Sequence, residues 1–206
     1  MAVVSNGTTI IDAGALGSGV ATGKMILIKT LTASSSNTLS FLNGASSVVF
    51  DDTYNSYAFK FIDIHPATDA AVFQFNVSID TGSNYNVAKT TTNFRAYQAE
   101  DGSSTSLNYH SSEDLAQGTG FQTLCYDIGN DNDQSASGSM TLFNPSSTVF
   151  VKHFISSGNM VINADYAATT NVGGYANTTS AVDAVQFKMN SGNIGSGVIK
   201  LYGIGG

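Results

Sequence analysis

Few side chains in this chain are suited to acid–base chemistry. Its 206 residues hold two glutamates, Glu100 and Glu113, both in polar stretches, and three histidines, His65, His110 and His153. A glycoside hydrolase needs two carboxylates across a cleft, and the spacing singles out no such pair. The sequence also has no G-x-S-x-G, C-x-x-C or H-E-x-x-H motif, each of which would indicate a nucleophilic or metal-dependent enzyme. We therefore expect a protein without enzymatic activity.

The densest group of metal-binding side chains is the segment DIGNDND, residues 127–133. Its aspartates, Asp127, Asp131 and Asp133, and its two asparagines offer the hard oxygen ligands that calcium prefers. Their order differs from an EF-hand loop, which has a glycine at its sixth position and a glutamate at its twelfth. An acidic turn between two strands has the same composition. We interpret the segment as a turn, with calcium as the one cofactor to test there.

The overall charge excludes one large class of partner. Charged residues make up 11% of the chain, and the net charge is −7 with Arg95 as the single arginine. Nucleic-acid binding needs clustered cations to neutralise phosphates, so we expect no nucleic-acid partner. No run approaches the ~18 apolar residues of a membrane span, and the N-terminus lacks the basic and apolar regions of a secretion signal. We therefore expect no membrane insertion, and synthesis in a cytoplasm.

The elements that position these side chains have the pattern of β-strands. In residues 70–80, apolar and polar side chains alternate with the period of a strand. Similar segments recur at a spacing of roughly ten to fifteen residues, separated by Gly, Asn, Asp and Ser clusters, as in two-layer β-proteins. This spacing predicts an all-β fold, an antiparallel β-sandwich of the jelly-roll type, over residues 24–206. Residues 1–23, rich in glycine, are interpreted as a flexible N-terminal arm or linker.

The end of the chain predicts an ordered strand. Residues 180–189 and 197–204 flank the turn sequence SGNIGS and are interpreted as the two arms of a hairpin. Residues 197–204 are too apolar to be left unpaired, so we expect this strand inside the sheet. One face of it would be Ile199 and Leu201, and the other, half-covered face Val198, Lys200 and Tyr202.

Three segments carry a resemblance to a known group of proteins. They are HPATDAAVFQFNVSIDTGSNYNVAKTTTNFRAY, DLAQGTGFQTLCYDIGNDNDQSASGSMTLFNPSSTVFVKHF and TSAVDAVQFKMNSGNIGSGVIKLYGI. Together they resemble proteins of marine bacteriophages that are described as virion structural or uncharacterised, with the closing SGNI…KLYGI hairpin as the most recognisable signature. The resemblance covers about residues 24–204. It implies a component of a virus particle, assembled in the host cytoplasm, and it brings no catalytic residues with it.

Two functional hypotheses follow. The first is a non-enzymatic virion structural protein displayed on the particle, as capsid decoration, head or tail fibre, or knob. It would form a homo-oligomer, a trimer, and contact other phage capsid or tail proteins. The alternative is a carbohydrate- or receptor-binding β-sandwich at a fibre tip, which would bind a host-surface glycan through Tyr97, Tyr109 and Tyr126.

Overall fold

The protein is built from antiparallel β-strands. The computed structural model describes residues 3–5, 8–12, 15–16 and 25–205. Every regular element in these ranges is a strand, and every strand pairing is antiparallel. The predicted all-β antiparallel fold is therefore confirmed. Within the same ranges, no helix is long and apolar enough to cross a membrane.

The first three strands form a sheet of their own. They are β1 (Val3–Ser5), β2 (Thr8–Asp12) and β3 (Ala15–Leu16), in the order β1-β2-β3. All three fall in the segment 1–23 that was predicted to be a flexible arm or linker. The remaining residues of that segment lie outside the described ranges.

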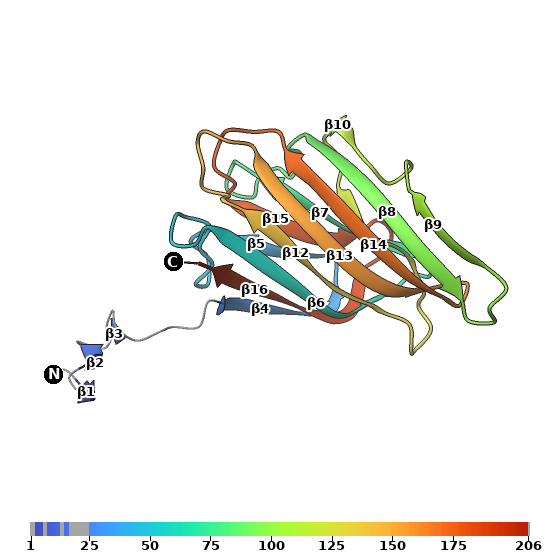
Figure 1. Cartoon of the computed structure of the whole chain (residues 1–206), viewed down its shortest axis with the longest axis horizontal. Helices are drawn as coiled ribbons and strands as arrows, with labels where there is room; N and C mark the ends of the chain where they lie inside the picture. Colours follow the sequence, from blue (N-terminus) through green and yellow to red (C-terminus); the bar gives the residue numbers. More distant parts are fainter. Residues whose placement is uncertain (1–2, 6–7, 13–14, 17–24, 206) are drawn as a thin grey trace.

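The body of the protein consists of thirteen strands in one hydrogen-bonded sheet. They are β4 (Met25–Ser36), β5 (Thr38–Leu42), β6 (Ser56–Pro66), β7 (Ala71–Ser78), β8 (Lys89–Ala99), β9 (Thr105–Tyr109), β10 (Ala116–Gly118), β11 (Gln122–Ile128), β12 (Ala136–Phe143), β13 (Lys152–Ile162), β14 (Tyr166–Ala176), β15 (Ala184–Met189) and β16 (Ile194–Ile204). The larger layer has the order β4-β16-β6-β12-β13-β14-β8-β9, and the smaller layer the order β11-β7-β15-β5 (Figure 1). Strand β10 pairs with β8.

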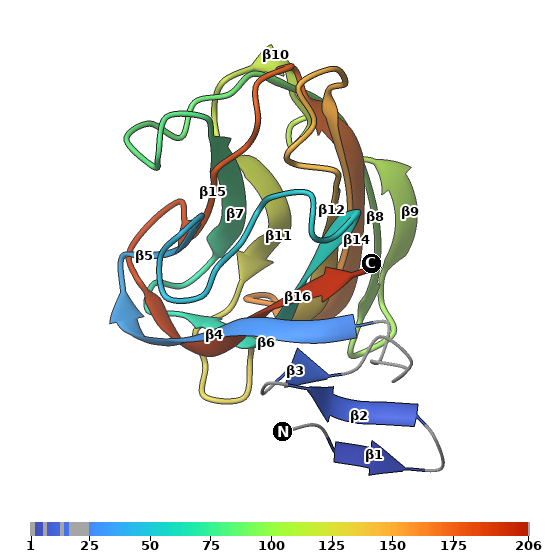
Figure 2. The ribbon, with the colours of Figure 1, turned by 90° about the vertical axis from the view of Figure 1, so that its left-hand side faces the viewer.

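The two layers are continuous with each other. On one side, β13 of the larger layer pairs with β11 of the smaller one at Ile162 and Ile128. On the other side, β4 passes into β5 with only Asn37 between them. The sheet therefore curves around the core and is nearly closed into a barrel, as the end-on view in Figure 2 shows.

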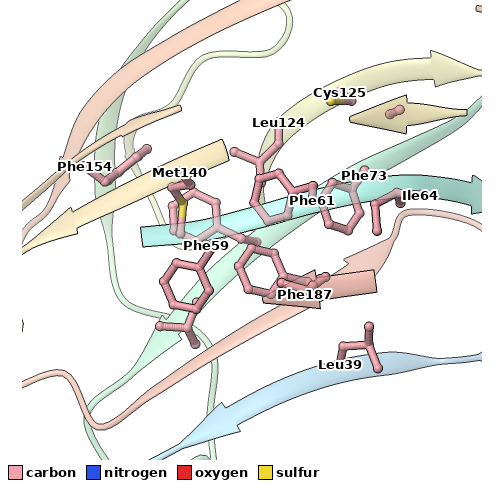
Figure 3. Close-up of a cluster of buried hydrophobic side chains, with 14 of the residues drawn as sticks. Leu39, Phe59, Phe61, Ile64, Phe73, Leu124, Cys125, Met140, Phe154 and Phe187 are labelled. Atoms are coloured by element: carbon pink, nitrogen blue, oxygen red, sulfur yellow. The ribbon is translucent and has the colours of Figure 1, made fainter. Parts of the chain in front are cut away.

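The core between the layers is dominated by phenylalanine. Phe187 of β15 is fully buried, and Figure 3 shows it among side chains from both layers. Its ring centroid lies 5.2 to 6.3 Å from those of Phe41, Phe59, Phe61, Phe73 and Phe75. Such edge-on and offset ring pairs add to the free energy gained from burying the rings. Cys125 is 2% exposed and packs as a small apolar residue in this core.

The predicted C-terminal hairpin is wrong, although its last strand is placed as expected. Strand β15 pairs with β7 and β5 in the smaller layer, whereas β16 pairs with β4 and β6 in the larger one. The segment between them therefore crosses from layer to layer instead of turning back. Within β16, Ile199 and Leu201 are fully buried while the other face is half-buried, as predicted.

Glycine is required where β16 passes the end of β6. Gly197 has a φ of +124°, a conformation that side-chain-bearing residues rarely adopt. A Cβ at this position would lie 2.7 Å from the carbonyl oxygen of Asp63 and 2.9 Å from the Cα of Ile64. Nearby, the carbonyl oxygen of Asn193 accepts a hydrogen bond of 3.0 Å from the amide of Ala67. The SGNIGSG and HPATD sequences are therefore in direct contact, which ties the end of the chain to β6.

Candidate functional site

The predicted calcium segment forms the connection between β11 and β12. Asp127 is exposed near the end of β11, and Asp131 and Asp133 are exposed in the turn that follows. The amide of Gln134 donates to the carbonyl oxygen of Asp131 at 2.9 Å, which closes this turn. Among the described residues, no group of three or more His, Cys, Asp or Glu side chains is arranged to hold a metal ion. The structure thus supports the turn interpretation and does not bring the three aspartates into one ligand set.

The three tyrosines predicted to bind glycan do not share a surface. Tyr97 of β8 and Tyr126 of β11 both contact Arg95, whose Cζ lies 5.6 and 5.1 Å from their ring centroids. Tyr126 is only 3% exposed, so its ring is not free to stack on a ligand. Tyr109 of β9 is 46% exposed and packs against Phe94, away from the other two.

Arg95 is the centre of a partly buried cluster, the Arg95 cluster, formed with Tyr97, Asn108, His110 and Tyr126. The Nε–H of Arg95 donates to Asn108 at 3.1 Å, and the ring of His110 packs edge-on against Tyr126. Burial raises the pKa of Tyr126, whereas burial and the charge of Arg95 lower the pKa of His110. The Tyr126 hydroxyl, His110 Nδ1 and the Asn93 amide have no hydrogen-bond partner among the described residues. The cluster therefore combines one cation with neutral side chains, and it packs β11 against β8 and β9.

Buried lysines are a second unusual feature. Lys89 is fully buried, and its Nζ donates to Asn76 Oδ1 at 2.6 Å and to the Val87 carbonyl oxygen at 2.9 Å. Burial lowers the pKa of Lys89 to about 7. Lys152 is also fully buried, donates to two backbone carbonyls, and has its pKa lowered by burial. Each ammonium donates two hydrogen bonds inside the fold, so we interpret these lysines as structural groups.

One histidine, His65, lies at a polar cavity beside the SGNIGSG segment. This cavity of about 530 Å³ is lined by His65, Asp63, Asp133 and Ser196, among others. Its His65 Nδ1 is 2.7 Å from the carbonyl oxygen of Gln134. His65 is thus a half-buried strand-end histidine, as its position next to Pro66 favours, but its backbone partner lies 69 residues away in the connection between β11 and β12.

The outer face of β4, β16 and β6 exposes apolar side chains around two lysines. We call it the lysine-pair surface, and it consists of Met25, Leu27, Lys60, Ile62 and Lys200. The three apolar members are 42%, 52% and 39% exposed. Lys60 and Lys200 are direct cross-strand partners, and two like charges in such a pair repel each other. An acidic group placed on this surface would relieve that repulsion and cover the apolar side chains.

No protein-family model matches the sequence, and no curated protein is significantly similar to it. The sequence did not point to the lysine-pair surface either. Alternation in β6 places Lys60 on the outer face, but nothing local shows that Lys200 lies beside it.

Proposed function

We propose that this protein is a non-enzymatic structural protein of a bacteriophage particle, displayed on its surface as capsid decoration, fibre or knob, and self-associating through the lysine-pair surface. The observation that carries the proposal is the exposure of Met25, Leu27 and Ile62 around the repelling pair of Lys60 and Lys200. Exposed apolar residues that lie together mark interaction sites. A structural protein present in many copies meets such a partner in its neighbour.

A second copy of the chain has the chemistry that this surface requires. The net charge of −7 means that carboxylates are abundant elsewhere on the molecule. Glu100, Asp101 and Asp165, for example, line one cavity at the turn between β8 and β9. A contact between the lysine-pair surface and such an acidic region joins two different patches, and head-to-tail contacts of that kind form a ring when the rotation between copies closes and an open filament when it does not. A trimer is a small ring of this type.

Charge reversal tests the self-association. We expect the wild-type chain to be oligomeric by size-exclusion chromatography with light scattering, and the double variant Lys60→Glu/Lys200→Glu to be monomeric with an unchanged far-UV circular dichroism spectrum. Lys188→Glu, which reverses a charge on β15 in the other layer, is the matched control and should stay oligomeric. A monomeric wild type, or an oligomer that tolerates the double reversal, would overturn this assignment.

The particle role has its own test. Mass spectrometry of purified particles of the encoding virus should find the chain in stoichiometric amounts, and labelled antibody should mark one location in electron micrographs. Its absence from purified particles would refute a virion role even if the chain oligomerises.

Carbohydrate binding is the second candidate function. It is favoured by an uncharged groove on the outer face of the larger layer, which has aromatic and hydroxyl side chains in its walls. The two functions are compatible, because a displayed protein is well placed to meet a host glycan.

A further inference from the structure

Two adjacent glycines occupy the interior of β14. This strand pairs along its whole length with β13 and with β8, without a shift in register on either side. Glycine weakens a strand, because it loses more backbone entropy on folding and offers no side chain to pack. The presence of Gly173 and Gly174 in this strand therefore needs an explanation. A β-bulge is not the explanation, because the register is unbroken on both sides.

The two glycines differ in what surrounds them. A Cβ on Gly174 would lie 2.6 Å from the Thr90 carbonyl oxygen and 2.6 Å from the Thr91 Cγ2, so packing forbids a side chain there. A Cβ on Gly173 would meet only Thr92 Oγ1 at 3.7 Å, which is ordinary van der Waals contact. The fold would accept a side chain at position 173. A glycine that the fold does not need, in the middle of a strand, is typical of a place where a ligand approaches the backbone.

The missing side chain leaves a groove on the outer face of the larger layer. The groove has a volume of about 500 Å³ and lies over β8, β12, β13 and β14, which run side by side in Figure 1. This volume is within the range of small-molecule sites. The side chains in its walls that matter here are Thr92, Phe143, His153, Ile155 and Tyr175.

The side chains in the walls favour a ligand without charge that has an apolar face. The rings of His153 and Tyr175 meet edge-on with centroids 6.0 Å apart, and Phe143 and Ile155 are 39% and 61% exposed. None of the residues that line the groove, all of them in the described part of the chain, is Asp, Glu, Lys or Arg. A charged ligand would lose hydration here without gaining a counter-charge. A sugar ring without charged groups has an apolar C–H face for the rings and hydroxyls for the Tyr175 hydroxyl and the His153 ring nitrogens, whereas the Thr92 hydroxyl already donates to the Gly173 carbonyl oxygen at 3.3 Å.

We propose that the Gly173 groove binds a neutral saccharide, with Gly173 as the floor and the His153–Tyr175 pair as the wall. This inference rests on carbohydrate binding, the second candidate function. It does not depend on the lysine-pair surface, which lies on other strands. It also replaces the three tyrosines predicted from the sequence with a different set of residues.

Gly173→Val is the sharpest test, because its effects on folding and on binding should be opposite. Valine suits a β-strand, so the melting temperature should hold or rise. The branched side chain fills the floor of the groove, so affinity for a neutral saccharide should fall at least tenfold. Asn171→Val is the matched control, since residue 171 lies on the same face of β14 outside the groove, and it should leave affinity unchanged.

The binding experiment uses a glycan array that carries both neutral hexose oligosaccharides and sialylated or uronic-acid oligosaccharides, followed by titration calorimetry with the strongest hit. We expect wild-type binding to neutral glycans, retained in Lys60→Glu/Lys200→Glu and lost in Gly173→Val. Should Gly173→Val lose its fold, Tyr175→Ala replaces it, with the same loss of affinity expected. Binding to acidic glycans alone, no binding at all, or affinity unaffected by these variants would refute the saccharide site. A change of oligomeric state in Gly173→Val would show instead that the groove holds a neighbouring subunit.

Discussion

Lys89 should make the stability of this protein rise with pH across the neutral range. Burial lowers its pKa from an ordinary value of 10.5 to about 7. Between these two pH values the unfolded chain holds a proton that the folded chain has released. Because the unfolded state binds more protons there, the free energy of unfolding increases with pH. At about 1.4 kcal/mol for each unit of pKa difference, the increase from pH 7 to pH 9 is about 2 kcal/mol.

Urea unfolding at pH 7, 8 and 9 measures this slope. The chain has nine tyrosines and no tryptophan, so tyrosine fluorescence and far-UV circular dichroism are the probes. Above pH 9 the trend is opposed by Cys125, because burial raises the pKa of its thiol to about 12 and only the unfolded chain then loses that proton. Measurements should therefore stop at pH 9.

The variant Lys89→Met removes the titrating group, so its free energy of unfolding should be nearly independent of pH between 7 and 9. Lys152→Met is the control, and it should keep most of the slope. A wild type without this increase, or a Lys89→Met variant that keeps the wild-type slope, would contradict the lowered pKa of Lys89. A chemical-shift titration of the Lys89 side chain by NMR would give the same pKa without unfolding.

Three further predictions concern the core and its edges. Phe187→Ala should lower the free energy of unfolding in urea by about 3–5 kcal/mol, because it empties the space between five other rings. A loss below about 1 kcal/mol would mean that the core collapses to fill the cavity. Cys125, buried and with a raised pKa, should react with a thiol reagent only in denaturant, and rapid labelling of the native protein would contradict its place in the core. Deleting residues 197–206 removes most of the strand between β4 and β6, so no soluble folded protein should form, and a native circular dichroism spectrum would show that β16 is dispensable.

The alternation of apolar residues in β7 could be predicted because it depends on local chemistry. Phe73, Phe75 and Val77 are at most 1% exposed, as their spacing requires. The opposite face was predicted to be polar, and yet Asn76 on that face is fully buried. Its Nδ2 donates to the carbonyl oxygen of Tyr85 at 2.7 Å, in a loop that covers the strand. The alternation predicts on which face of the sheet a side chain lies. Whether that face is buried depends on the loops that cover it, which the alternation does not predict.

The partners of each strand could not be predicted in the same way. Residues 180–189 and 197–204 are close in the chain and have complementary patterns, so a hairpin was the simplest interpretation. The structure places them in different layers because β4 and β6, far away in the sequence, pair with both edges of β16. The same limit applies to the surfaces. Lys60 lies beside Lys200 only because β6 pairs with β16. Gly173 can be recognised as part of a groove only once its neighbours on β8 and β13 are known.

The pairing of β4 with β16 also brings the two ends of the body together. The chain enters the body at Met25 and leaves at Ile204, and these two residues are direct cross-strand partners. The path of the backbone through the body is therefore almost a closed circuit. A short linker could join these ends, and the circuit could be opened at the exposed turn around Gly102 between β8 and β9. Such a circular permutant would keep every strand pairing of the body, and its new ends would lie at the turn between β8 and β9.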